Sequence, residues 1–204
     1  MWTGIKNNGA GKVEVFDNPV LGKCLKFTTT VLRHPGDPFR ISPEKKIPHL
    51  DPSIKANWSL GSEIIFDVGF VPTGDASISI ENVFSEIKEL GIDYIPMASI
   101  DISSSSPSLK AKDPINIGCD WAKYRTTYEL KVGIPYYFEL KTMGPNIFLY
   151  INDELITSGP LHPNLVGVAP VMVKSGAYGY LIKPGKSMYE GNLSFQIFNY
   201  ISTG

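Results

Sequence analysis

The sequence predicts an all-β protein in which two antiparallel sheets pack face to face. Short runs rich in Val, Ile, Phe, Tyr and Thr alternate with polar residues, and 19 Gly and 16 Pro divide these runs. The order of segments lacks the strand–helix–strand alternation of a parallel sheet. Hydrophobic residues make up 43% of the sequence and aromatic residues 11%, enough to fill a core. We therefore predict a jelly-roll β-sandwich that forms one domain over residues 1–204.

The first strands are predicted near the N-terminus. Residues 12–16 alternate, residues 17–22 carry the Asn, Pro and Gly of a turn, and residues 24–30 alternate again, which predicts a hairpin. Similar runs predict further strands at residues 63–70, 77–80, 99–102, 124–130, 136–142, 147–151, 155–157, 168–173 and 193–200. The clearest hairpin joins 136–142 to 147–151, because Gly and Pro stand between two alternating runs.

Two segments are less clear. Residues 82–90 place apolar side chains at helical spacing and also fit a buried strand followed by a Gly turn, and we favour the strand. Ser103, Ser104, Ser105 and Ser106 form a serine run. Together with Pro107 and residues 110–114 this run predicts an exposed loop.

Charge and rare residues exclude several classes. The formal net charge of −1 gives no global field to collect nucleic acid or an anionic membrane, and no apolar stretch approaches the roughly 20 residues of a membrane span. Two cysteines cannot build a disulfide framework, and three histidines without ligand spacing argue against zinc. We expect no cofactor. A structural calcium ion is the alternative, with Asp17, Asn18, Asp153 and Asn199 as its candidate ligands.

Four stretches carry a family resemblance. They are KVEVFDNPVLGKCLKF at 12–27, FRISPE at 39–44, FSEIK at 84–88 with Pro96 beyond it, and MVKSGAY at 172–178. Their sequence and order resemble the jelly-roll polysaccharide lyases of the alginate, glucuronan and heparin-lyase-like group. Concanavalin-like lectins share this sandwich. The resemblance implies a concanavalin-like fold and a carbohydrate-active protein that would work outside the cell if it is a lyase, although the N-terminus lacks a secretory-signal pattern.

The resemblance implies Arg40, Lys88, Lys174 and Tyr178 as catalytic residues. A lyase must neutralise the substrate carboxylate and then move a proton, and a permanently charged Arg can grip a carboxylate bidentately. A Tyr whose pKa is lowered by cations can act as base, acid or both. Lys174 stands four residues before Tyr178, which on a strand is the same face. The alternatives are a packed Tyr178 and a surface ion pair for Arg40.

The sequence departs from the lyase pattern at two positions. Glu86 stands where the family carries an amide, and Lys88 where it carries a catalytic His. A carboxylate would repel a uronate unless it is protonated or paired, and the plain alternative is a Glu86–Lys88 ion pair.

Substrate-binding candidates complete the expected site. These are Glu86, His34, Trp58, Tyr94 and Tyr180, with Trp58 and Tyr94 expected at an exposed rim where they could stack on a sugar. Trp121 is expected in the core.

Two functions follow from these residues. The first is a lyase that cleaves a uronic-acid polymer by β-elimination, and the second is a non-catalytic, lectin-like glycan-binding protein. A structural domain without a sugar site is a third class that nothing specific in the sequence favours. The expected partner is a polysaccharide or glycan, with no nucleic acid and no membrane.

Overall fold

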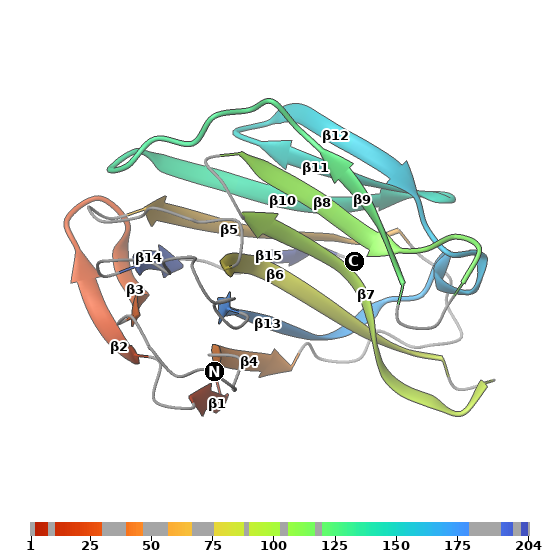
Figure 1. Cartoon of the computed structure of the whole chain (residues 1–204), viewed down its shortest axis with the longest axis horizontal. Coiled ribbons are helices and arrows are strands. Elements are labelled where there is room, and N and C mark those ends of the chain that lie inside the picture. The colour runs from red at the N-terminus through yellow and green to blue at the C-terminus, as the bar shows by residue number, and fades with distance from the viewer. Residues whose placement is uncertain are drawn as a thin grey trace, which may run out of the picture.

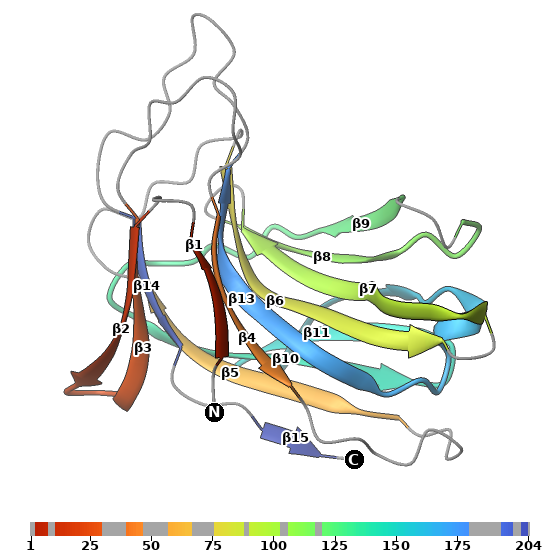
Figure 2. The same ribbon diagram turned by 90° about the horizontal axis from the view of Figure 1, so that it is seen from below.

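The computed structural model describes residues 3–7, 11–29, 40–46, 57–66, 76–87, 90–102, 106–116, 120–179, 193–197 and 201–203. Within these ranges the chain is almost entirely β-strand, and every strand pairing is antiparallel. The strands form two sheets (Figures 1 and 2). The predicted jelly-roll sandwich is therefore confirmed. No helix in the described ranges is long and apolar enough to cross a membrane.

The first sheet has seven strands. In spatial order they are β1 (Thr3–Asn7), β4 (Arg40–Lys46), β13 (Pro170–Gly179), β6 (Ala76–Ile87), β7 (Ile92–Ile102), β8 (Pro107–Lys112) and β9 (Trp121–Arg125). Strands distant in sequence, such as β4 and β13, are thus neighbours. Figure 2 shows β13, β6 and β7 bending along their length.

The second sheet has eight strands. Seven follow one path in the order β12 (Glu154–Pro160), β11 (Asn146–Ile151), β10 (Pro135–Met143), β5 (Ser59–Phe66), β14 (Leu193–Ile197), β3 (Gly22–Thr29) and β2 (Gly11–Asn18). The eighth, β15 (Ile201–Thr203), pairs with β5.

Alternation of side chains builds the core between the sheets. On β11, Ile147, Leu149 and Ile151 are fully buried while Phe148 and Tyr150 are half-buried on the other face. The side-chain period of two explains this pattern. The largest fully buried side chains come from both sheets and are Phe66, Phe138, Leu60, Ile64, Met97, Ile100 and Ile102. Burial of each such side chain is worth about 1.5–3 kcal/mol.

Most of the predicted local elements are present. The hairpin β10–β11 turns at Gly144, whose positive φ of 56° suits a residue without a Cβ. The hairpin β2–β3 turns after Asn18, whose Oδ1 accepts from the N–H groups of Val20 and Leu21 at 2.8 and 3.0 Å. Residues 82–87 belong to β6, which confirms a strand rather than a helix.

Two predictions about local structure are wrong. The segment from Pro107 to Lys112 is strand β8 rather than an exposed loop, and its burial pattern is nearly continuous. Leu109 and Ala111 face the core and alternate with more polar residues. The serine run and the nearby Pro114 made this alternation hard to recognise as a strand. The strand expected at 124–130 ends at Arg125, and residues 126–130 have no regular structure.

Candidate functional site

The strands β4 and β13 place two expected site residues opposite each other. Their antiparallel ladder pairs Tyr178 with Arg40, and the same ladder pairs Lys174 with Glu44. On its other side, β13 pairs Tyr178 with Ser77 of β6 and Lys174 with Asn82. Segments 138 residues apart in sequence thus meet at one register position. These are the two residues that the sequence resemblance implies for binding a carboxylate and for moving a proton.

Lys174 identifies the outer face of this sheet, which we define as the face turned away from the core. Its neighbour Val173 is fully buried in the core cluster, so Lys174 lies on the opposite side of the strand. Lys174 is nevertheless only 8% exposed. A lysine held at a buried position of the outer face brings a positive charge close to the middle of the sheet.

The structure separates Glu86 from this pair. Glu86 is the penultimate residue of β6, and its neighbour Ser85 pairs with Pro170 at the start of β13. Eight residues along β13 separate Pro170 from Tyr178, which is about 26 Å at 3.3 Å per residue. The backbone register therefore does not bring Glu86 to the end of the sheet where Arg40 and Tyr178 meet.

The remaining expected residues are distributed as follows. Tyr94 lies on β7, near its start. Lys88, His34 and Tyr180 lie outside the described residues.

Neither Trp58 nor Trp121 lies where the sequence predicts. Trp58 is 3% exposed and belongs to the core cluster, and its Nε1 donates to the carbonyl of Val168 at 3.1 Å. This corrects the expectation of an exposed rim position, because both faces of the ring are covered by packing. Trp121 is half-buried on β9 instead of in the core cluster. The Lys112 Nζ lies 5.0 Å from the centre of its ring, in the range of a cation–π contact.

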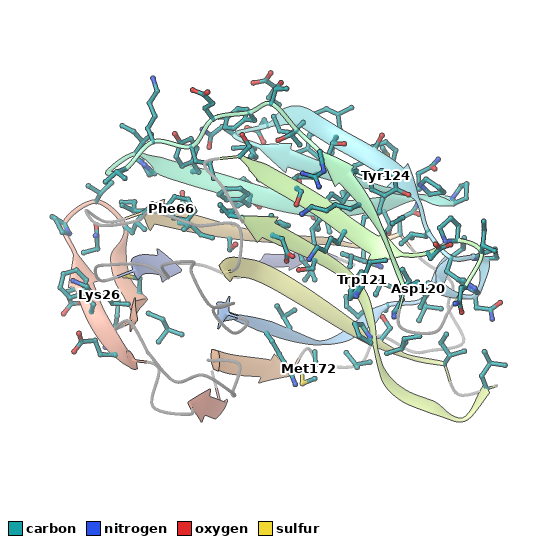
Figure 3. All side chains as sticks on the ribbon, in the orientation of Figure 1. Lys26, Phe66, Asp120, Trp121, Tyr124 and Met172 are labelled. Carbon is teal, nitrogen blue, oxygen red and sulfur yellow. The ribbon has the colours of Figure 1, made fainter. Side chains whose placement is uncertain are left out.

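A second group of side chains, which sequence reasoning missed, lies on β7, β8 and β9. The ladder β8–β9 pairs Lys110 with Lys123, Ser108 with Arg125, and Lys112 with Trp121. Leu109 and Ala111 between them face the core, so the polar residues of β8 lie on the outer face. We call Lys110, Lys112, Lys123 and Arg125 the basic cluster. Figure 3 labels Trp121 and Tyr124, which both belong to β9.

A buried carboxylate supports the basic cluster from β7. Asp101, 5% exposed, forms an ion pair with Lys110 and accepts a hydrogen bond from Ser99 Oγ at 2.6 Å. Ser108 Oγ donates to the Asp101 carbonyl at 3.2 Å. Ser99 and Ser108 are themselves buried. The polar groups beneath the cluster are thus held in place by one another.

The positive charges of the basic cluster affect the pKa of Lys123. Lys123 is exposed, but partial desolvation of its ammonium, and after it the charges of Lys110 and Arg125, lower its pKa, while Asp101 acts in the opposite sense. Like charges on directly opposite strands repel each other. Among the described residues, Lys123 and Arg125 form no ion pair with a carboxylate.

Other tyrosines are poor candidates for proton transfer. Burial, followed by the charge of Asp113, raises the pKa of Tyr124, and burial also raises that of Tyr128. A raised pKa makes a phenol harder to ionise at neutral pH. Neither residue is therefore suited to act as a base.

The described part of the chain offers no group of three His, Cys, Asp or Glu side chains that could hold a metal ion. Asn18, one of the residues considered for calcium, is used in the β2–β3 turn. Asp153 lies with Asn152 in the tight β11–β12 turn, where both have positive φ. Asn199 lies outside the described residues.

Comparison with known proteins shows the fold. A glucuronan lyase from the fungus Trichoderma reesei superimposes with a TM-score of 0.70 at 12% identity, covering 98% of this chain and 90% of that one. The family 7 alginate lyase A1-II' superimposes with a TM-score of 0.60 at 11% identity, covering 93% and 82%. The chain thus has the fold of the jelly-roll polysaccharide lyases, as its sequence motifs indicate.

The same fold also occurs in a binding module. The binding domain of a botulinum neurotoxin, solved in complex with rat synaptotagmin II, superimposes with a TM-score of 0.57 at 14% identity over 97% of this chain and 43% of that one. No family model matches the sequence, and no curated protein matches it. At such identities the likeness establishes architecture, and activity must be argued from the residues.

Proposed function

We propose that this protein is a polysaccharide lyase that cleaves a uronic-acid polymer by β-elimination. The observation that carries the proposal is the pairing of Arg40 with Tyr178 on adjacent strands of the seven-stranded sheet. These residues come from two separate motifs that resemble the lyases, and the ladder brings them together. The fold shared with a glucuronan lyase and with alginate lyases supports the same activity.

The proposed chemistry assigns one task to each residue. Arg40 binds the carboxylate of the uronate and reduces the cost of negative charge at the neighbouring C5. The Tyr178 phenolate takes the C5 proton, the C4–C5 double bond forms, and the C4–O bond breaks. The leaving sugar oxygen then takes a proton from the Tyr178 hydroxyl, so that the phenolate is regenerated. The product carries an unsaturated uronate at its new non-reducing end.

Lys174 is proposed as a positioning residue. It stands four residues before Tyr178 on β13, about 13 Å along the strand, where its charge would help hold the acidic polymer on the same face. Lys174 is 8% exposed, so its position is fixed by the residues packed around it. The carboxylate-neutralising role falls to Arg40 in this scheme, since Glu86 lies toward the other end of β6.

A second candidate function is glycan binding without cleavage. It is favoured by Glu86, which stands where the lyases carry an amide, and by the neurotoxin domain, which has this fold and acts by binding. A protein of this kind would keep the outer face as a recognition surface. Arg40 would then contribute to affinity instead of catalysis.

An absorbance assay separates these functions. The purified protein is incubated with alginate, glucuronan, hyaluronan and heparin-like polymers, and the ultraviolet band of unsaturated uronate is followed. A lyase increases this absorbance with at least one polymer. No increase with any of the four, together with clear glycan binding by the same folded preparation, contradicts the lyase and supports the binding protein.

A further inference from the structure

The outer face contains a continuous line of paired residues that joins the two groups described above. Gly176 of β13 pairs with Ser79, Ser79 with Asp101, Asp101 with Ser108, and Ser108 with Arg125. Tyr178 is two residues from the start of this line. Four strand spacings of about 4.8 Å place its far end roughly 19 Å away. One extended polymer lying across the strands can therefore reach both groups.

Two members of the basic cluster, Lys123 and Arg125, are placed to bind an anion. The nearby carboxylate of Asp101 is already paired with Lys110. Lys123 and Arg125 are exposed, stand two residues apart on β9, and have no carboxylate partner among the described residues. Such an arrangement costs free energy in the empty protein, and a bound anion recovers that cost.

Hydrogen bonds and packing hold the residues around the basic cluster in place. Ser99, Asp101 and Ser108 form a buried hydrogen-bonded floor, and Lys112 is 2% exposed against the Trp121 ring. Trp121 is half-buried, so part of this residue is open to solvent on the same strand as the two cations. A flat apolar surface next to positive charge suits a sugar ring that carries an acidic substituent.

We infer that Lys123 and Arg125 form an anion-binding subsite for the acidic substituents of a polysaccharide, with Trp121 beside the sugar ring. The inference rests on the proposed function, because it assigns the same polymer a path from Tyr178 across the sheet to β9. Carboxylate and sulfate groups share the chemistry required here. The overall charge of −1 argues against a general binder of polyanions such as nucleic acid.

The test is a binding measurement on the whole chain. Titration calorimetry compares the wild type with the double variant Lys123→Ala/Arg125→Ala, using oligosaccharides of glucuronan, alginate and heparin. Because charge-assisted hydrogen bonds are lost, affinity for the acidic oligosaccharides is expected to fall about tenfold to a hundredfold. The dependence of affinity on salt concentration falls with it. Tighter binding of the carboxylated or of the sulfated oligosaccharides identifies which acidic group the subsite prefers.

The control removes the same number of charges elsewhere. Lys23→Ala/Lys131→Ala changes two exposed lysines, one on β3 and one in the segment before β10, and is expected to keep the wild-type affinity within about twofold. If the alanine pair does not fold, Lys123→Gln/Arg125→Gln keeps side chains of similar length. Unchanged affinity in the Lys123/Arg125 variant contradicts the subsite.

The outcomes separate the subsite from the lyase activity. Cleavage by the wild type with unchanged binding by the variant overturns the subsite and leaves the lyase standing. Binding without cleavage, lost in the variant, supports the subsite and overturns the lyase. A wild type that binds no acidic oligosaccharide, or that binds single-stranded nucleic acid instead, overturns the subsite.

Discussion

The two ends of the outer face differ in what their residues can do. At the β4–β13 end, the ladder pairs Arg40 with Tyr178, and the proposed reaction gives each of them a separate task. At the β8–β9 end lie four cations, and the carboxylate of Asp101 pairs with one of them, Lys110. In the proposed function, the first end carries the chemistry and the second end contributes affinity.

On the proposed scheme, catalysis and polymer recognition can be lost separately on this sheet. Loss of a proton-transfer group stops the reaction without removing the surface that holds the polymer. Loss of one cation from a cluster weakens binding gradually, because its neighbours remain. The change of a single catalytic residue could therefore convert a lyase with this fold into a binding protein.

The largest expected effect is that of Tyr178→Phe. The change removes the ionisable hydroxyl, so the cleavage rate should fall about 10²- to 10⁴-fold while polymer binding survives. Initial rates from the unsaturated-uronate absorbance measure the fall. Tyr150→Phe is the matched control, because Tyr150 lies half-buried on the second sheet. If the protein only binds glycans, Tyr178→Phe changes the affinity by no more than about 1–2 kcal/mol.

The next effect distinguishes the two faces of the seven-stranded sheet. Leu109→Ala leaves a cavity in the core and should lower the free energy of unfolding by about 2–5 kcal/mol, since Leu109 is fully buried. Urea unfolding followed by fluorescence measures the change. The outer-face substitution Arg125→Met on the neighbouring strand β9 should cost less, because Arg125 is exposed. A smaller loss for Leu109→Ala than for Arg125→Met would contradict the assignment of faces.

Asp101→Asn should lower the stability less than Leu109→Ala does, and it should strengthen the binding of acidic oligosaccharides. It removes the negative partner of Lys110 and weakens the hydrogen bond from Ser99, so unfolding should become easier by about 1–3 kcal/mol. The basic cluster becomes more positive, and acidic oligosaccharides should bind more tightly. Calorimetry at low salt tests the second effect, and weaker binding would contradict the role assigned to the cluster.

The smallest effect is a pH-dependent gain from Lys123→Gln. Partial desolvation and two neighbouring cations lower the pKa of Lys123, so its charged form is penalised in the folded state. The penalty is present at neutral pH and disappears as the pH rises toward 10.5, where Lys123 loses its proton in the unfolded chain as well. The variant should be more stable by at most about 0.5 kcal/mol at pH 7. The difference in melting temperature from the wild type should shrink in alkaline buffer, and a constant difference would contradict this account.

The sequence predicted the features that depend on neighbouring residues. The β10–β11 hairpin is an example, because alternation and a Gly-Pro turn lie within one short stretch. The order of the lyase-like motifs also predicted the sandwich. The meeting of Arg40 with Tyr178 was expected only through that resemblance, since their pairing depends on a ladder between distant segments.

The basic cluster could not be found in the same way. Lys110 and Lys112 were hidden in a segment whose Ser and Pro content suggested a loop, and their partners on β9 follow only from the register. The alternation of Leu109 and Ala111 with polar residues was the available signal. The tryptophans show a related limit, because residue type indicates that Trp58 and Trp121 bury their rings but does not indicate how deeply.

One contact at the rim of the sandwich ties two distant positions of the sequence together. The Tyr124 ring of β9 lies against Gly159 of β12, and a methyl group at position 159 would overlap that ring. The Tyr124 hydroxyl also donates to the Pro160 carbonyl at 3.5 Å. Positions 124 and 159 should consequently change together among relatives of this protein. Where glycine at 159 is replaced, the residue at 124 should be smaller, so that β9 can keep its distance from β12.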